Sequence, residues 1–316
     1  MAKSKLVMAA LAVTAGVTLV AASATQAQAV RPDSGPAAAA TGPMFFAAEL
    51  RGGNEVGPTG TPGVGDPDGR AVEVVRIQGT QVSFAIAWRN IAPPTAGHIH
   101  MGAAGMNGGV VVPFFGGALP ATIDRITGSV MTSQATVDAI LANPAGFYVN
   151  LHTPDFPAGA VRDQLRPLKH PVDLQQFLQV GPLLSVDSGD QEIAGGDADG
   201  HANAFVRARG GTVRFGFTWS AIASPSAGHI HQGGVGVNGP VVVPFFSAPG
   251  GLPMSINGIA GTVTGIDPAL TASINRNPRG FYTNLHNADF PGGAVRGQLF
   301  RLGAAGNDDD EVTLDG

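Results

Sequence analysis

Hydrophobic and polar residues alternate along short runs of this chain, and Gly or Pro residues separate one run from the next. Such alternation over about four to eight residues is typical of a β-strand with one buried face. In the first half of the chain the pattern predicts strands near residues 44–50, 71–77, 81–88, 97–101, 110–115, 124–131, 147–152 and 160–165. Between residues 133 and 143, the spacing of Val137, Ile140 and Leu141 instead predicts one short helix.

The same pattern returns in the second half of the chain. The stretch 96–115 reappears almost unchanged as 227–246, and the equivalent helix is expected at residues 268–276. Both Trp and both Tyr residues of the chain are matched pairs, so the chain contains two copies of one unit. Many short strands joined by Gly- and Pro-rich turns predict an all-β fold. We expect two tandem antiparallel β-sandwich domains of Greek-key type, each with one short helix.

The domain boundaries follow from changes in composition. We place the first domain at residues 43–168, a linker at 169–174 and the second domain at 175–302. Residues 1–29 resemble a cleaved signal peptide, because two lysines precede an apolar run and Ala27-Gln-Ala29 ends it. A retained N-terminal anchor is the alternative. We expect disorder in residues 30–42 and in the acidic tail 303–316, secretion of the mature protein, and no membrane span after cleavage.

Charge and composition narrow the possible functions. The chain has 18 Lys and Arg residues against 23 Asp and Glu residues, so its composition gives no basic footprint for nucleic acid or an anionic membrane surface. It contains no Cys, so a metal site must use His, Asp or Glu. No Gly-x-Ser-x-Gly motif or other nucleophile constellation is present. We therefore expect a protein that is not an enzyme.

Histidines supply the candidate chemistry. Six of the eight occupy matched positions in the two copies, namely His98, His100 and His152 in the first and His229, His231 and His286 in the second. Residues two apart on a strand point to the same face, so His98 and His100 lie together while Ile99 points into the core. The same alternation places His152 on that polar face if the strands are neighbours.

Other polar residues are expected around these histidines. They are Asn150, Asp155, Arg162 and Gln164 in the first copy, and Asn284, Asp289, Arg296 and Gln298 in the second. The two aspartates have two alternative roles: they pair with the arginines, or they accept a hydrogen bond that fixes one tautomer of a histidine.

Two interpretations of the histidine cluster remain open. Three imidazoles bind zinc or copper with bonds of about 2.0–2.1 Å, and a site built from nitrogen favours copper. Each domain is then a metal-binding module. In the alternative, the histidines hydrogen-bond to the loop backbone and only order the structure. The protein is then a structural or adhesive module whose partner is another extracellular protein or a cell-surface polymer.

The motifs resemble one known family. The resemblance rests on Gly97-His-Ile-His100, Asn107-Gly-Gly-Val-Val111, Phe147-Tyr-Val-Asn-Leu-His152 and Gly159-Ala-Val-Arg-Asp-Gln-Leu165, with all four repeated in the second copy. Together they are similar to the CHRD domain. The opening motif Leu50-Arg-Gly-Gly-Asn-Glu-Val56 is weaker in the second copy. The resemblance implies an extracellular β-sandwich and defines no biochemical role.

A weaker resemblance concerns the His-x-His strand alone. It is similar to the strand that supplies copper ligands in copper-zinc superoxide dismutase, where a later His and Arg follow in the same order as His152 and Arg162. This implies a dismutase-like enzyme as a third alternative. The disulfide cysteines and a recognisable zinc loop are missing from the chain.

Overall fold

Each copy of the repeat folds into its own pair of β-sheets in the computed structural model, which describes residues 42–301. The predicted signal peptide at 1–29, nearly all of the segment 30–42 and the tail at 303–316 lie outside the described residues. Within residues 42–301, no helix has both the length and the apolar character needed to cross a membrane.

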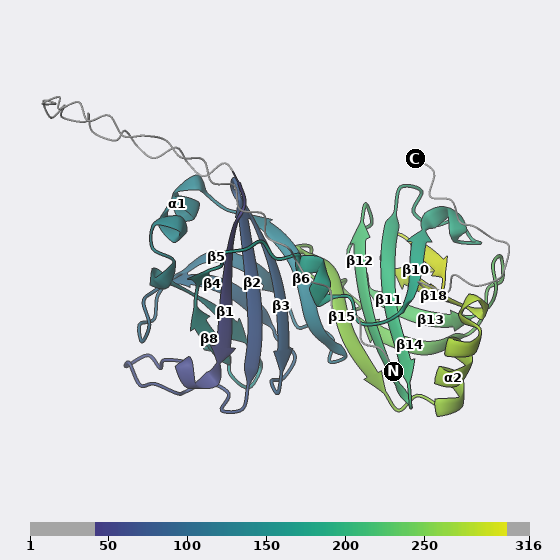
Figure 1. The fold of residues 1–316 in the computed structure, drawn as a ribbon, viewed down its shortest axis with the longest axis horizontal. Coiled ribbons are helices and arrows are strands. Elements are labelled where there is room, and N and C mark those ends of the chain that lie inside the picture. Colours follow the sequence, from purple (N-terminus) through teal and green to yellow (C-terminus); the bar gives the residue numbers. More distant parts are fainter. Residues whose placement is uncertain (1–41, 302–316) are drawn as a thin grey trace, which may run out of the picture. The chain divides into compact units, whose positions relative to one another are not determined.

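The first copy contains two antiparallel sheets (Figure 1). One sheet has the order β1 (Met44–Arg51), β2 (Arg70–Gln78), β3 (Gln81–Arg89), β6 (Ile123–Met131). The other has the order β5 (Val110–Gly116), β4 (Ala96–Met101), β7 (Phe147–His152), β8 (Val161–Gln164). Because β6 pairs with β3 and not with β5, the connection is of the Greek-key type. The sheets meet where Arg51 of β1 pairs with Arg162 of β8, and β9 (Arg166–Pro167) also pairs with β1.

The second copy repeats this order. Its first sheet contains β10 (Leu183–Ser188), β11 (His201–Arg209), β12 (Thr212–Ser220) and β15 (Ile256–Thr264). Its second sheet contains β14 (Val241–Ser247), β13 (Ala227–Gln232), β16 (Phe281–His286) and β17 (Val295–Gln298), and β18 (Phe300–Arg301) pairs with β10. β6 also pairs with β15. The predicted all-β, antiparallel sandwich fold is confirmed.

Two short helices interrupt the strands, as the sequence predicts. They are α1 (Gln134–Ala142) and α2 (Pro268–Arg276). The side chains of Ser133 and Asp267 cap their first turns by accepting hydrogen bonds from backbone N–H groups. Both helices end at an Asn that precedes Pro, a position that disfavours helical backbone. Short 3₁₀ helices lie in the connections between strands, at Gly52–Asn54, Pro144–Gly146, Leu174–Phe177, Gly189–Gln191 and Pro278–Gly280.

The core determines which side chains face outward near the histidines. Ile99 on β4 and Val149 and Leu151 on β7 are fully buried between the sheets. Their neighbours in the sequence therefore point to the opposite face of the same strands. Gly97 lets the two strands on either side of β4 approach, because a Cβ atom there would lie 2.6 Å from the ring of Phe115 and 3.1 Å from Leu151.

One position breaks the apolar pattern of the first core. Glu73 on β2 lies on the same face as Ala71 and Val75, is fully buried, and neither carboxylate oxygen has a hydrogen-bond partner within the described residues. Burial raises the pKa of Glu73 well above its ordinary value. The equivalent residue of the second copy is Ala204, which pairs with β10 and β12 as Glu73 pairs with β1 and β3.

Candidate metal centre

The three matched histidines of each copy converge in space, which gives two histidine clusters. β4 carries His98 and His100 on one face, and β7 pairs with β4 so that His152 lies opposite Ala96, next to His98. One ligand nitrogen from each ring lies within 4.8 Å of the others, and the same holds for His229, His231 and His286. Nδ1 of His98 lies 3.2 Å from Nε2 of His152. The two histidine-bearing strands are therefore neighbours in both copies, as β4 and β7 in the first and as β13 and β16 in the second.

Backbone carbonyls fix the tautomers of two rings in each cluster. Nδ1 of His100 lies 2.9 Å from the carbonyl oxygen of Gly108, and Nδ1 of His152 lies 3.0 Å from that of Pro157. Since a carbonyl only accepts hydrogen bonds, both Nδ1 atoms carry the proton, and both Nε2 atoms keep a lone pair. In the second copy the carbonyls of Gly239 and Pro291 do the same at 2.9 Å and 3.0 Å.

One of these lone pairs has no partner. Nε2 of His100 is buried and forms no hydrogen bond within residues 42–301, and Nε2 of His231 is in the same state. A buried acceptor without a donor costs about 1–3 kcal/mol of stability. A cation placed among the three nitrogens would satisfy it.

The environment keeps the imidazoles neutral. Burial, together with the neighbouring histidines, lowers the pKa of His98 and of His229 to about 4. Burial also lowers the pKa of His100, His152, His231 and His286. Neutral imidazole is the form that binds metal ions. At neutral pH a metal ion could therefore enter either cluster without a net release of protons from the imidazoles.

Tyr148 and Arg162 support His100 from the side. The ring of Tyr148 stacks on His100 with centroids 4.9 Å apart and an angle of 7°, and the guanidinium carbon of Arg162 lies 3.4 Å from the centre of the Tyr148 ring. Tyr282 stacks on His231 at 4.7 Å, and Arg296 lies 3.6 Å from the Tyr282 ring. Both arginines are almost completely buried.

The glycine-rich loop at residues 102–109 folds over this stack. Arg162 donates hydrogen bonds of 2.9 Å to the side-chain oxygen of Asn107 and to the carbonyl of Met106. The backbone N–H of Gly108 donates to the Tyr148 hydroxyl at 3.3 Å. A Cβ atom on Gly108 would lie 1.5 Å from the carbonyl oxygen of Met101, so only glycine fits here. Gly108 therefore links the tautomer of His100 to the position of Tyr148.

A buried carboxyl group next to the cluster was missed by the sequence-based site prediction. Asn150 donates from Nδ2 to both oxygens of Glu55, at 2.9 Å and 3.1 Å. Burial raises the pKa of Glu55 to about 8, although the charge of Arg162 and the hydrogen bond from Asn150 lower it. In the second copy Asn284 donates to Glu192, whose pKa burial raises to about 7. The sequence does contain a signal for this pair, because Glu55 and Glu192 each follow the first strand of their copy.

The other residues predicted around the histidines make different contacts from one another. Gln164 lies beside the cluster but donates to three backbone carbonyls, those of Gly102, Ala145 and Phe147, and Gln298 repeats this pattern. The roles expected for Asp155 and Asp289 are filled by other groups. Both aspartates are exposed, Arg162 bonds to Asn107, and the Pro157 carbonyl holds His152. Backbone carbonyls reach these positions because the chain turns back immediately after the histidine.

Two stretches of the chain, residues 46–165 and 184–299, match the family model described as CHRD domain. Each matched stretch contains one of the two pairs of sheets and one complete histidine cluster. No curated protein matches the chain. The remaining two histidines, His170 and His201, are exposed and belong to neither cluster.

Proposed function

The chain belongs to the CHRD domain family through two tandem copies, and from the histidine cluster in each copy we propose that each domain binds one transition-metal ion, copper, in a secreted protein that is not an enzyme. The ligands are Nδ1 of His98 with Nε2 of His100 and His152, and the same atoms of His229, His231 and His286. Secretion is proposed from the N-terminal sequence pattern alone.

The observation that carries the metal proposal is the set of lone pairs. Two nitrogens in each cluster are held unprotonated by backbone carbonyls, and one of these, on His100 or His231, is buried without a partner. A cluster that only ordered the loops would pair its ring nitrogens with the surrounding backbone. The unpaired nitrogen recurs in both copies, which favours an ion over a purely structural cluster.

The geometry suits a metal ion after a small adjustment. Bonds of about 2.0–2.1 Å require the three nitrogens to lie about 3.3–4.2 Å apart, and they already lie within 4.8 Å. Small rotations of the imidazole rings would bring the three nitrogens to the required separations. Copper is favoured over zinc because all three donors are neutral nitrogens, for which copper has the highest affinity among the common divalent ions.

The position of Arg162 supports a binding protein over a dismutase-like enzyme. Its guanidinium is engaged by Asn107, Met106 and the face of Tyr148, and only 1% of the residue is exposed. It is therefore not available to attract an anionic substrate from solution. Arg296 is held by the equivalent groups of the second copy.

Metal content of the full chain tests the proposal. After loading with Cu(II) and gel filtration, mass spectrometry should find two ions per chain in the wild type, one in His100→Ala or His231→Ala, and none in the double variant. The matched control is His170→Ala with His201→Ala, which removes the two histidines outside the clusters and should leave both ions bound. A wild type without stoichiometric metal, or a double variant that keeps it, would overturn the proposal.

A further inference from the structure

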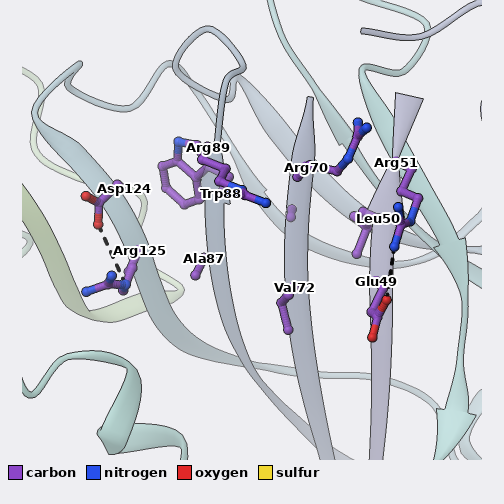
Figure 2. Close-up of a pocket in the computed structure, with 11 residues that line it drawn as sticks. Glu49, Leu50, Arg51, Arg70, Val72, Ala87, Trp88, Arg89, Asp124 and Arg125 are labelled. Atoms are coloured by element: carbon purple, nitrogen blue, oxygen red, sulfur yellow. Dashed lines mark hydrogen bonds and ion pairs between the residues drawn. The ribbon is translucent and has the colours of Figure 1, made fainter. Parts of the chain in front are cut away.

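An arginine-lined groove lies on the outer face of the β1–β2–β3–β6 sheet of the first copy (Figure 2). It has a volume of about 450 Å³ and an apolar floor that includes Val72 and Ala87. Its charged residues are Arg51, Arg70, Arg89 and Arg125, with Glu49 and Asp124 as the acids. The overall composition of the chain gave no indication of a basic surface, because these arginines are gathered from four separate strands.

Three of the arginines form a ladder across neighbouring strands. Arg51 lies directly opposite Arg70, and Arg70 lies directly opposite Arg89. Opposite residues of antiparallel strands point to the same face, and the strands are about 4.8 Å apart. Like charges in such positions destabilise a sheet. The repulsion among the three arginines therefore destabilises the sheet, and the fold itself does not require it.

The acids of the groove compensate the ladder only at its margins. Glu49 lies 3.4 Å from Arg51 in a pair whose side chains are both more than half exposed, and Asp124 lies 3.8 Å from Arg125. The exposed pair of Glu49 and Arg51 contributes little to stability. Within the described residues, Arg70 bonds only to the carbonyls of Pro67 and Gly69, and Arg89 has no ion pair.

The second copy shows that the fold does not need this ladder. In the same register it has Ser188, His201 and Ser220 in place of the three arginines. Gly258 pairs with Thr218 as Arg125 pairs with Ala87. The second copy thus offers a complete set of substitutions that is compatible with the same pairing of strands.

We propose that Arg51, Arg70 and Arg89 bind the carboxylates of a linear acidic polysaccharide, a polymer of uronic acid. Guanidinium groups pair with carboxylates through two parallel hydrogen bonds. The line of three arginines across the sheet complements a linear polymer that carries one carboxylate on each sugar unit. Val72, of which 46% is exposed, provides an apolar surface for the C–H face of a sugar ring.

The geometry favours a polysaccharide over an acidic peptide or a nucleic acid. Extended peptides bind sheets by adding a strand at an edge, whereas the ladder runs across the face of strands that are already paired. Single-stranded nucleic acids need exposed aromatic platforms, and Trp88, the one aromatic residue of the lining, is only 8% exposed.

Binding of sodium polygalacturonate to the full chain tests the proposal, with neutral dextran as the control polymer. The variant Arg51→Ser, Arg70→His, Arg89→Ser transfers the residues of the second copy to the first. Loss of three charge-assisted contacts should weaken binding by about 100-fold or more at low salt. Circular dichroism and the melting temperature of the variant report on folding. Binding should decrease with added salt and should be unchanged by EDTA, which separates it from the metal proposal.

Other outcomes of the same experiment would overturn the proposal. They are absence of polygalacturonate binding to the wild type, equal binding to a folded triple variant, or loss of binding in EDTA. Monomeric galacturonate that competes as well as the polymer would identify a small acid as the ligand. A synthetic peptide of residues 303–316 that binds more tightly than the polymer, and depends on the same arginines, would identify the chain's own acidic tail.

Discussion

Nδ1 of His98 lies 3.2 Å from Nε2 of His152, and the corresponding atoms of His229 and His286 are 3.1 Å apart. Because the Pro157 carbonyl fixes the proton of His152 on Nδ1, its Nε2 accepts, and Nδ1 of His98 must donate. The metal-free cluster is therefore closed by one hydrogen bond between two of its proposed ligands. A bound ion would replace that bond.

This arrangement predicts a change of tautomer in one ring per cluster. Zn(II) replaces copper in this test because it is diamagnetic. When Zn(II) binds, the proton of His98 should move from Nδ1 to Nε2, while His100 and His152 keep theirs on Nδ1. Nitrogen-15 chemical shifts of the imidazoles distinguish the two tautomers. The exposed His170 and His201 serve as internal references. If all six cluster rings kept their tautomers in a Zn(II)-loaded protein, the assigned ligand atoms would be wrong.

The stability of the metal-free protein should depend on pH through the histidines. The pKa of His98 and His229 is about 4 in the folded protein, against about 6.5 in an unfolded chain. The unfolded state therefore gains protons first as the pH falls. The stabilising contribution is complete above about pH 6.5 and is lost progressively towards pH 4. Urea unfolding at a series of pH values measures it, and His98→Gln with His229→Gln should flatten the dependence. An unchanged slope in that variant would contradict the assignment.

Hydrogen bonds should hold the loop over the first cluster more firmly than the equivalent loop of the second copy. Asn107 donates to the carbonyls of Val56 and Gly57 at 2.8 Å and 3.2 Å and accepts from Arg162 at 2.9 Å. Asn238 has one such bond within the described residues, from Arg296 at 3.3 Å. Asn107→Ala should cost about 1–3 kcal/mol of stability, and Asn238→Ala less.

Copper affinity should follow the same order. Asn107→Ala in the His231→Ala background, where only the first site binds, should weaken binding by about 10- to 100-fold. Asn238→Ala in the His100→Ala background should have a smaller effect. Competitive titration with a chelator of known affinity measures both. Equal effects of the two substitutions would show that the contacts to Val56 and Gly57 do not position the cluster.

Replacing Glu73 should stabilise the first domain. Its carboxyl is fully buried and unpaired within the described residues, and its pKa is raised well above the ordinary value. The unfolded chain ionises above about pH 4.5, so the penalty grows as the pH rises. Glu73→Leu should therefore raise stability at pH 8 by about 1–3 kcal/mol and by less at pH 4. Ala204→Glu is the reciprocal substitution and should destabilise the second domain. A destabilising Glu73→Leu would indicate that the carboxyl has a partner.

Much of the site could be predicted from local features of the sequence. The direction of a side chain on a strand has a period of two, so the placement of His98 and His100 on one face, opposite Ile99, needs only the strand itself. The duplication then identified which histidines lie in the two clusters, since His170 and His201 have no partner in the other copy. The fold class and both helices follow from the same periodic patterns and their capping residues.

The tertiary structure alone decided how those residues are used. The proton positions depend on carbonyls of Gly108 and Pro157, which every residue type possesses and which therefore leave no mark in a sequence. The partner of Asn150 is Glu55, and the Arg51–Arg70–Arg89 ladder depends on register across the loop 52–69. Such contacts are set by long-range strand pairing and loop packing, whereas a sequence pattern reports only the neighbours along the chain.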